Sequence, residues 1–456
     1  MLFHSSRGKD YNKSFKDIAI QGLASDGGLF IPDYWPQIDL DRIRKCKTYP
    51  DVVKLVLPFF AKSSYKEDQI IAMVDEIWKE FPSKELVQIQ EFDNFSIAEL
   101  FHGPTAAFKD FGLQMVSYFL NKILTEQNRN GVILGATSGD TGSAAIHACK
   151  RYSNIKTFIL LPEGNMSEIQ RRQMSTVNQE NIFSIKVNGT FDDCQDIVKK
   201  AFNSERFLPE SFALLSVNSI NWIRIIAQIC YYFFAFSLTN TKKEICLSVP
   251  SGNFGNVFSA YSAFKMGLPV KEICVAVNSN DILHRFFSSN DYSKRNTVST
   301  ISPSMDISVA SNFERLVYDY YLDRDPDACR ELFNNLNSDK IVIDKELFKQ
   351  KLNLFSSLSV TDLETKALIR RVYDDYQYVV DPHTAIACAR ALIQSERHVI
   401  VMATAHPEKF PDLLKSLNIP INKHHSALQG LLKLDEKLIE LPCDYSAIKD
   451  FIKSSL

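Results

Sequence analysis

A lysine in an apolar segment is the first residue whose type and setting could do chemistry. Lys109 ends the run Phe101-His-Gly-Pro-Thr-Ala-Ala-Phe-Lys. Three phenylalanines lie close to it in the sequence: Phe101, Phe108 and Phe111. Apolar surroundings disfavour the ammonium form and lower the pKa of a lysine, so that its free amine can attack an aldehyde. Pro104 and Thr105 suit a helix start, which would place Lys109 on the first turns. Taken alone, Lys109 is better explained as an ordinary solvated lysine.

A second candidate is the turn Ser251-Gly-Asn-Phe-Gly-Asn256, between an apolar run and a helix-like segment. Small residues let backbone N–H groups converge, and the N-terminus of a helix favours negative charge. The candidate phosphate ligands are Gly252, Asn253, Phe254, Gly255 and Asn256. The turn matches neither a Walker loop nor Gly-x-Gly-x-x-Gly, and a plain turn without a ligand is an equal alternative.

A third candidate is Gly135-Ala-Thr-Ser-Gly-Asp-Thr-Gly142, again between a strand-like run and a helix. Thr137, Ser138 and Thr141 supply hydroxyls beside a helix start, where a carboxylate or phosphate oxygen would be stabilised. The alternative is a capped turn with no ligand, which explains eight successive small or polar residues less well.

Two further turns offer weaker signals. In Ala403-Thr404-Ala405-His406-Pro407, the Thr404 hydroxyl could bond a neutral ring nitrogen. His406 could titrate near neutral pH, although a lone histidine beside proline is more often structural. Asp381-Pro-His383 resembles a helix start and is assigned a structural role.

Basic side chains could meet a substrate phosphate at two places, because arginine pairs bidentately with phosphate oxygens. Asn221 and Arg224 are three residues apart and would share one helix face. Arg171 and Arg172 form the other set, for which a solvated helix face is at least as good an explanation.

The elements that must position these residues follow from the pattern of apolar runs. Six strand-like runs each end in a polar turn that contains Gly, Pro, Asn or Ala-Thr: 131–134, 155–161, 182–187, 245–249, 273–277 and 398–402. Most lead into a helix, which predicts parallel sheets with helical crossovers. Ligands of such folds bind outside the carboxyl ends of the strands, where these turns would lie. Residues 1–90 and 310–375 have mainly helical patterns.

Length and composition set the outer limits. A chain of 456 residues is expected to form two or three domains. Its formal charge of -2, without long charged blocks, gives no basis for binding nucleic acid or a membrane surface. The run from Ile225 to Phe236 is too short to span a bilayer and predicts a buried helix. Nine scattered cysteines without a Cys-x-x-Cys pair argue against disulfides and a metal site. With no secretion signal at the N-terminus, the cytoplasm is the expected compartment.

The turns taken together, in this order, resemble the threonine synthase family. The resemblance rests on His102-Gly-Pro-Thr-Ala-Ala-Phe-Lys-Asp, Ala136-Thr-Ser-Gly-Asp-Thr-Gly, Gly252-Asn-Phe-Gly-Asn and Ala403-Thr-Ala-His-Pro. Gly22-Leu-Ala-Ser-Asp-Gly-Gly-Leu-Phe-Ile-Pro and Asp381-Pro-His-Thr-Ala are similar to its longer bacterial and fungal branch. The resemblance covers nearly the whole chain and implies the α/β tryptophan-synthase-β-like fold, which is fold type II of pyridoxal-phosphate enzymes. We expect a helical N-terminal domain (1–90) and a catalytic region (91–456). Within the latter we expect a small α/β subdomain (130–215) and a large one (91–129 and 216–456) that carries a helical insertion (310–375).

The resemblance also implies roles for the candidate residues. Lys109 would hold pyridoxal phosphate as a Schiff base, residues 252–256 would bind the cofactor phosphate, and Thr404 would face the pyridine nitrogen. The implied reaction converts O-phospho-L-homoserine and water to L-threonine and phosphate. We assign the substrate carboxylate to Thr137, Ser138, Gly139 and Thr141, and the substrate phosphate to Ser219, Asn221 and Arg224. A monomer or a homodimer is expected.

Three other functions share these features. A phospho-lyase would release 2-oxobutyrate and ammonia from the same substrate. A dehydratase of serine or threonine would use a substrate without phosphate. A catalytically silent relative could act as a binding protein, although the retained Lys109 and Gly-Asn-Phe-Gly-Asn argue against this.

Overall fold

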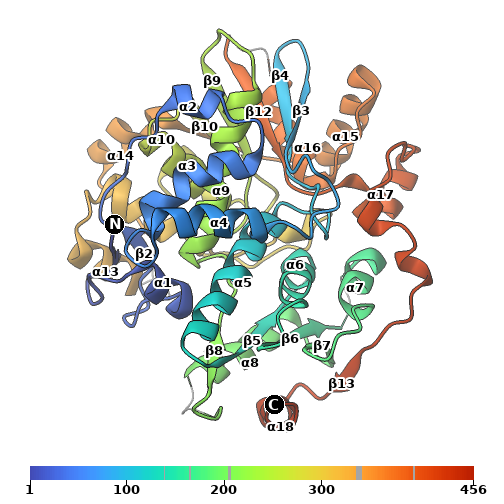
Figure 1. Cartoon of the computed structure of the whole chain (residues 1–456). Coiled ribbons are helices and arrows are strands. Elements are labelled where there is room, and N and C mark those ends of the chain that lie inside the picture. Colours follow the sequence, from blue (N-terminus) through green and yellow to red (C-terminus); the bar gives the residue numbers. More distant parts are fainter. Residues whose placement is uncertain (138, 164–165, 204–206, 335–340, 394–395) are drawn as a thin grey trace.

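Two sheets of parallel strands organise the chain, one above the other in Figure 1. The structure is a computed structural model that describes all residues except 138, 164–165, 204–206, 335–340 and 394–395. The six-stranded sheet has the order β11-β10-β9-β12-β4-β3, and the five-stranded sheet the order β13-β7-β6-β5-β8. Neighbouring strands are parallel throughout, except that β3 runs antiparallel to β4.

The strands of the larger sheet are β3 (Gln88–Glu91), β4 (Phe95–Glu99), β9 (Ile245–Pro250), β10 (Val270–Val277), β11 (Phe355–Ser359) and β12 (His398–Ala403). Those of the smaller sheet are β5 (Asn130–Ala136), β6 (Ile155–Pro162), β7 (Ile182–Val187), β8 (Phe212–Leu215) and β13 (Ile439–Leu441). The six apolar runs seen in the sequence are all strands, and the prediction of parallel α/β sheets is confirmed.

Seven helices lie around the larger sheet and its junction with the smaller one. They are α5 (Lys109–Glu126), α9 (Trp222–Leu238), α10 (Gly255–Lys265), α11 (Ile282–Ser289), α15 (Asp362–Tyr376), α16 (Pro382–Ala391) and α17 (Pro411–Ser416). Of these, α5, α9, α10 and α16 carry candidate site residues in their first turns. Every residue of α9 from 222 to 236 is buried, and the helix packs against α5 and α10. The prediction of a buried helix is therefore confirmed. Within the described ranges, no helix is long and apolar enough to cross a membrane.

The N-terminal segment is mainly helical, with α1 (Phe15–Gln21), α2 (Leu40–Arg44), α3 (Tyr49–Ala61) and α4 (Glu67–Ile77). A short antiparallel pair, β1 (Phe3–Ser5) and β2 (Phe30–Pro32), flanks α1. Helix α3 packs against α9, and residues of this segment belong to the same hydrophobic cluster as the larger sheet. The segment therefore supports the large sheet through a shared core.

Residues 310–375 are helical for most of their length, with α12 (Phe313–Leu316), α13 (Pro326–Asn334) and α14 (Lys345–Lys351) before α15. The expectation of a purely helical insertion is wrong at β11, which pairs with β10 at the edge of the larger sheet. Its sequence, Phe-Ser-Ser-Leu-Ser, is too polar to stand out as a strand, and its pairing with a buried neighbour decides its conformation.

The smaller sheet is covered by α6 (Asp140–Cys149), α7 (Glu168–Ser175), α8 (Phe191–Asn203) and α18 (Tyr445–Ser454). The expectation that the whole range 216–456 belongs with the larger sheet is wrong at its C-terminal end, because β13 pairs with β7 and α18 packs against α8. Ile448 and Ile452 are four residues apart on one helix face, and both join the apolar cluster on this side of the sheet. That burial brings the C-terminus to the smaller sheet, at the bottom of Figure 1.

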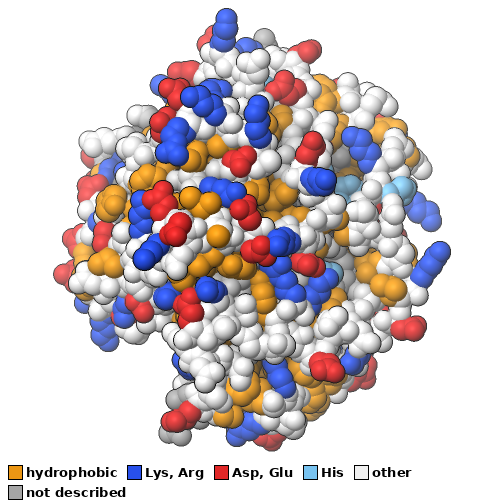
Figure 2. Space-filling view, viewed as in Figure 1, with side chains coloured by type: hydrophobic (Ala, Val, Ile, Leu, Met, Phe, Trp, Pro, Cys, Tyr) orange, Lys and Arg blue, Asp and Glu red, His pale blue; other side chains and the backbone are white. Residues whose placement is uncertain are grey.

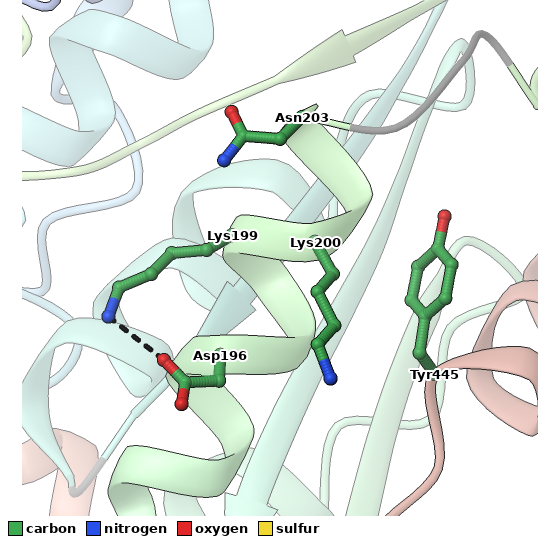
Figure 3. A pocket seen from close by; sticks show the side chains of 5 residues that line it. All are labelled: Asp196, Lys199, Lys200, Asn203 and Tyr445. Atoms are coloured by element: carbon green, nitrogen blue, oxygen red, sulfur yellow. Dashed lines mark hydrogen bonds and ion pairs between the residues drawn. The ribbon is translucent and has the colours of Figure 1, made fainter.

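Charged side chains of both signs are interspersed over the face shown in Figure 2, in line with the formal charge of -2. A shallow surface pocket between α8 and α18 also carries charged side chains of both signs (Figure 3). It is lined by Asp196, Lys199, Lys200, Asn203 and Tyr445, and Lys199 forms an ion pair with Asp196 at 3.0 Å.

The packing of α18 yields a stability prediction. Ile452→Ala removes a side chain that is 1% exposed, and the lost burial plus the residual cavity should lower the free energy of unfolding by about 2–4 kcal/mol. Urea unfolding followed by circular dichroism measures this change. Leu363→Ala, at a position that is 80% exposed, is the control and should change it by less than about 0.5 kcal/mol. Equal effects of the two variants would contradict the packing role of α18.

Candidate active site

Lys109 is the first residue of α5, and Phe108 is its N-cap. The helix therefore starts later than predicted from Pro104 and Thr105. The backbone N–H and the hydroxyl of Thr105 donate to the Asp110 carboxylate at 2.9 Å and 2.7 Å. Ala106 has a φ of 55°, which is incompatible with a continuous helix. This folded-back loop delays the helix and places Lys109 at its very beginning.

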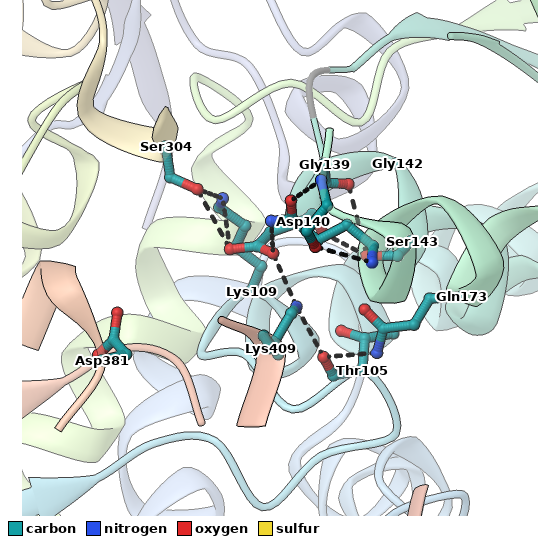
Figure 4. Close-up of polar contacts among 12 residues, drawn as sticks. Thr105, Lys109, Gly139, Asp140, Gly142, Ser143, Gln173, Ser304, Asp381 and Lys409 are labelled. Carbon is teal, nitrogen blue, oxygen red and sulfur yellow. Dashed lines mark hydrogen bonds and ion pairs between the residues drawn. The ribbon is translucent and has the colours of Figure 1, made fainter. Parts of the chain in front are cut away.

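The amine of Lys109 lies among polar groups that the sequence had not indicated (Figure 4). Its Nζ is 3.2 Å from Ser304 Oγ and 3.5 Å from Asp140 Oδ2. Burial lowers the pKa of Lys109, as predicted, and Asp140 opposes this shift. The side chain is only 12% exposed, so the expectation of an accessible surface lysine is wrong. Of the three phenylalanines, Phe108 has its ring centroid 6.0 Å from the amine.

Asp140 joins Lys109 to a second lysine. Lys409, in the 3-10 turn η4 (Pro407–Lys409), places its Nζ 2.7 Å from Asp140 Oδ1 and 2.9 Å from the carbonyl oxygen of Thr105. Gln170 on α7 also donates to Asp140 Oδ1 at 2.9 Å. Although burial alone would raise the pKa of Asp140, Lys409 and Lys109 hold it well below its usual range. The carboxyl group is therefore ionised between two amines.

Sequence reasoning missed both partners. Asp140 is the carboxylate inside Gly135–Gly142, and that signal was available in the sequence. Lys409 lies five residues beyond Thr404 and carries no local signal.

Ser304 belongs to the turn η1 (Pro303–Met305), a segment that carried no sequence signal. Its hydroxyl is 3.2 Å from Asp140 Oδ2, and its backbone N–H donates to His383 Nε2 at 3.3 Å. His383 Nδ1 is 2.6 Å from Asp381 Oδ2. Asp381 also caps α16, so the structural role predicted for this helix start is confirmed. The pair Asp381–His383 additionally holds the Ser304 turn beside Lys109.

The turn at 252–256 has the geometry of a phosphate cradle. Phe254 has a φ of 63° and caps α10, which begins at Gly255. A Cβ on Gly252 would lie 3.0 Å from both the Ser304 carbonyl oxygen and Met305 Cα, so a side chain here would push the Ser304 turn back. Asn312 donates its backbone N–H to the Asn253 carbonyl oxygen at 3.0 Å.

Two polar atoms at this turn, Ser251 Oγ and Asn256 Nδ2, are buried without a hydrogen-bond partner among the described residues. Asn256 Oδ1, by contrast, accepts from Tyr231 and Tyr232. Buried polar atoms are rarely left unpaired, and these two lie where a helix N-terminus already favours an anion.

The segment 137–141 connects the end of β5 to the first turn of α6, which begins at Asp140. Thr137 Oγ1 accepts the N–H groups of Gly139 and Gly142 at 3.0 Å and 2.9 Å, so this hydroxyl shapes the loop. Gly139 is adjacent to Asp140, and Thr141 lies half-buried on the first helical turn. Ser138 lies outside the described residues. The structure therefore brings the described part of this loop to Lys109 through Asp140.

The three residues predicted to bind the substrate phosphate, Ser219, Asn221 and Arg224, lie in different environments. Asn221 caps α9 by accepting from the Ile223 N–H, and its amide donates to the Ala19 carbonyl oxygen, so both ends of its side chain serve the fold. Ser219 Oγ is 3.3 Å from Ser311 Oγ. Arg224 is 2% exposed and donates to the Val217 carbonyl oxygen at 3.0 Å.

Arg224 is a buried cation that lacks a carboxylate partner in the described part of the chain. Its Nε has no hydrogen-bond partner there, and burial lowers its pKa to about 10. Arg171 and Arg172 differ, because both pair with Glu436, and the idea that they bind substrate finds no support.

The fourth predicted turn lies at the carboxyl end of β12. Thr404 is buried, and its carbonyl oxygen accepts the N–H of Phe108 at 2.9 Å, directly before Lys109. The structural role favoured for His406 agrees with its position, where its side chain accepts the Glu408 N–H at the start of η4. Burial, helped by the nearby His425, lowers its pKa to about 3.

Comparisons with known proteins identify the family. Residues 94–346 match the family model described as "Pyridoxal-phosphate dependent enzyme", and residues 2–78 and 384–452 match those described as "Threonine synthase N terminus" and "Threonine synthase, C-terminal". A threonine synthase of Pseudomonas aeruginosa is 40% identical over 99% of this chain and 98% of its own length. That of Saccharomyces cerevisiae is 39% identical over 88% and 86%.

Solved structures give the same answer. The crystal structure of PLP-bound threonine synthase from Brucella melitensis superposes with a TM-score of 0.93 at 36% identity, covering 99% of both chains. The yeast threonine synthase structure gives 0.91 at 34% identity, covering 100% of this chain and 98% of the other.

Fold and site thus define a pyridoxal-phosphate-dependent enzyme of fold type II. Its phosphate cradle, its two unpaired buried polar atoms and its partly buried lysine fit that cofactor. Within this class, the chain belongs to the threonine synthase family, and the resemblance seen in the sequence is confirmed.

Histidines tie the segment after α17 to the Lys109 loop. His425 contacts the His406 ring, with centroids 5.4 Å apart, and Glu408 accepts its backbone N–H at 2.7 Å. Burial lowers the pKa of His425 to about 4, and the charge of His102 would lower it further. The fold therefore holds this imidazole neutral.

A pH dependence follows from His425. The unfolded chain binds a proton at this residue below about pH 6.5 and the folded chain only below about pH 4, so acid favours unfolding across that window. His425 should contribute a loss on the order of 3 kcal/mol between these pH values. His425→Asn retains an acceptor but does not titrate, and should flatten the decline of unfolding free energy measured by urea denaturation. His424→Asn, at an exposed neighbour, is the control, and an unchanged slope in His425→Asn would contradict the assignment.

Proposed function

We propose that this enzyme converts O-phospho-L-homoserine and water to L-threonine and phosphate, with Lys109 as the lysine that binds the cofactor. The observation that carries this proposal is the position of Lys109. Its amine lies 3.5 Å from Asp140, which belongs to the segment 137–141 that we expect to face the substrate. The same amine contacts the Ser304 turn, which packs against Gly252 in the expected phosphate-binding turn. Residues 252–256 would hold the phosphate of pyridoxal phosphate, Lys109 would bind its aldehyde, and Thr404 would supply a hydroxyl to its ring nitrogen.

When bound, pyridoxal phosphate supplies an electron sink for negative charge beside the amino-bearing carbon. Lys109 removes the proton from Cα and then one from Cβ, which requires the neutral amine that burial favours. Phosphate leaves from Cγ with the C–O electron pair, and Cγ gains a proton. The hydroxyl of water then adds at Cβ and a proton returns to Cα.

The loop at 137–141 and the N-terminus of α6 would hold the substrate carboxylate through Gly139, Thr141 and Ser138, while Thr137 maintains the loop. Arg224 is the preferred ligand for the substrate phosphate, because its buried Nε lacks a partner in the described structure. Ser219 is a second candidate, whereas Asn221 acts on the fold.

The compartment and assembly remain predictions. All nine cysteines are free, and seven of them are buried, in keeping with a cytoplasmic enzyme. A monomer or a homodimer is expected.

The reaction is tested by product analysis. Purified enzyme with O-phospho-L-homoserine should release threonine and phosphate in equal amounts, and Lys109→Ala should reduce the rate by about 10²–10⁴-fold or more. Lys122→Ala, on the same helix and 41% exposed, is the control and should retain full activity. Formation of 2-oxobutyrate and ammonia without threonine would overturn the reaction, and an active Lys109→Ala would overturn the lysine assignment.

The role of Arg224 is tested by Arg224→Met. Loss of a charge-assisted contact worth about 1.5–3 kcal/mol should raise the KM for O-phospho-L-homoserine by about 10–100-fold while cofactor binding stays unchanged. Steady-state kinetics and cofactor titration measure the two effects. Arg171→Met, which breaks an ion pair with Glu436, should leave KM unaltered. A fall in kcat with unchanged KM would contradict a phosphate-binding role.

A further inference from the structure

One carboxylate is shared by two amines in the site, and their arrangement is unequal. Lys409 Nζ lies 2.7 Å from Asp140 Oδ1, whereas Lys109 Nζ lies 3.5 Å from Asp140 Oδ2 (Figure 4). Lys409 is 0% exposed and has a second acceptor, the Thr105 carbonyl oxygen at 2.9 Å. Both contacts hold this buried amine against the Asp140 carboxylate. Lys409 is thus the closer counter-ion of Asp140.

We propose that Lys409 is a positioning residue for the reaction, which neutralises Asp140 and so leaves Lys109 as an uncharged, reactive amine. Without Lys409, a buried and ionised Asp140 would have Lys109 as its nearest cation and would hold it as an ammonium ion. The proposal rests on Lys109 being the cofactor lysine.

Lys409 also acts across the two sheets. Asp140 is the first residue of α6 above the smaller sheet, and Lys409 follows β12 of the larger sheet. Their ion pair fixes the N-terminus of α6, and with it the loop at 137–141, next to Lys109. Gln173 on α7 donates to the same Thr105 carbonyl oxygen at 2.9 Å and makes this junction firmer.

Other groups near the pair do not replace Lys409. The charged or titratable groups that interact with Lys109, Asp140 or Lys409 through charge include Arg224 on α9, His383 on α16, Asp110 on α5, His147 on α6, His406 and His425. Arg224 acts on Lys109 in the same direction as Lys409, through charge, but forms no ion pair with Asp140 among the described residues. His383 acts on Asp140 through charge, and its hydrogen-bonded link to Asp140 runs through the Ser304 turn.

The experiment measures how fast the cofactor-free enzyme takes up pyridoxal phosphate at a series of pH values, because only the free amine of Lys109 reacts. The midpoint of this profile reports the protonation of Lys109, independently of turnover. Lys409→Met should raise the midpoint by about one to three pH units, and Asp140→Asn should lower it. In the double variant both charges are gone, so the midpoint should return close to that of the wild type.

A merely structural role predicts a different pattern, in which the damage of the two substitutions adds and no midpoint moves. Arg390→Met is the matched control, because it breaks a mostly buried ion pair with Glu272 at 2.9 Å, away from Lys109. It should lower stability and leave the midpoint in place. Equal midpoints in Lys409→Met and the wild type, or in the single and double variants, would overturn the proposal. Should Lys409→Met not fold, an unchanged midpoint in Asp140→Asn would overturn it as well.

Failure of the underlying function is distinguishable. Borohydride reduction of the loaded wild type, followed by peptide mapping, locates the lysine that carries the cofactor. A label on a lysine other than Lys109 would overturn the cofactor assignment, whereas a label on Lys109 with unmoved midpoints would overturn only the role of Lys409.

Discussion

The buried carboxylate of Asp140 is the constraint on which the site depends. An ionised carboxyl group away from water is tolerated only when cations and hydrogen-bond donors surround it. Here Lys409, Lys109 and Gln170 provide them. Because these residues come from both sheets, satisfying one charge also fixes how the sheets meet. Lys109, Asp140 and the Ser304 turn, which approaches Gly252, are brought together at that junction.

Backbone geometry also positions the residues of the site. Ala106 has a left-handed backbone conformation in the loop that leads to Lys109, the first residue of α5. Phe254 has the same conformation directly before Gly255, where α10 begins. Gly252 lets the Ser304 turn approach the turn at 252–256 more closely than a side chain would comfortably allow. Asp381 and His383 hold that turn from behind. Buried polar groups in this region therefore hold neighbouring turns and helices in place. Ser251 Oγ, Asn256 Nδ2 and Arg224 Nε have no hydrogen-bond partner among the described residues, and they lie where a cofactor or substrate phosphate is expected.

Much of the fold was predictable because its strands are short apolar runs that end in polar turns. The runs at 245–249 and 398–402 stand out for this reason. The edge strands did not, since Phe355-Ser-Ser-Leu-Ser takes its conformation from pairing with β10 rather than from its own pattern. Likewise, α18 shows an amphipathic sequence, but nothing in that sequence says which sheet it will cover.

The sequence by itself determined the family, the cofactor and the turns that carry the chemistry, because glycines and hydroxyl residues at strand ends leave a local signature. It also indicated Lys109. Only the tertiary structure decided which groups surround that lysine. Asp140, Ser304 and Lys409 are 31, 195 and 300 residues away from it along the chain, and a charge's partner is selected by distance in space. The same reason separates Arg224, buried without a partner among the described residues, from Arg171, which pairs with Glu436.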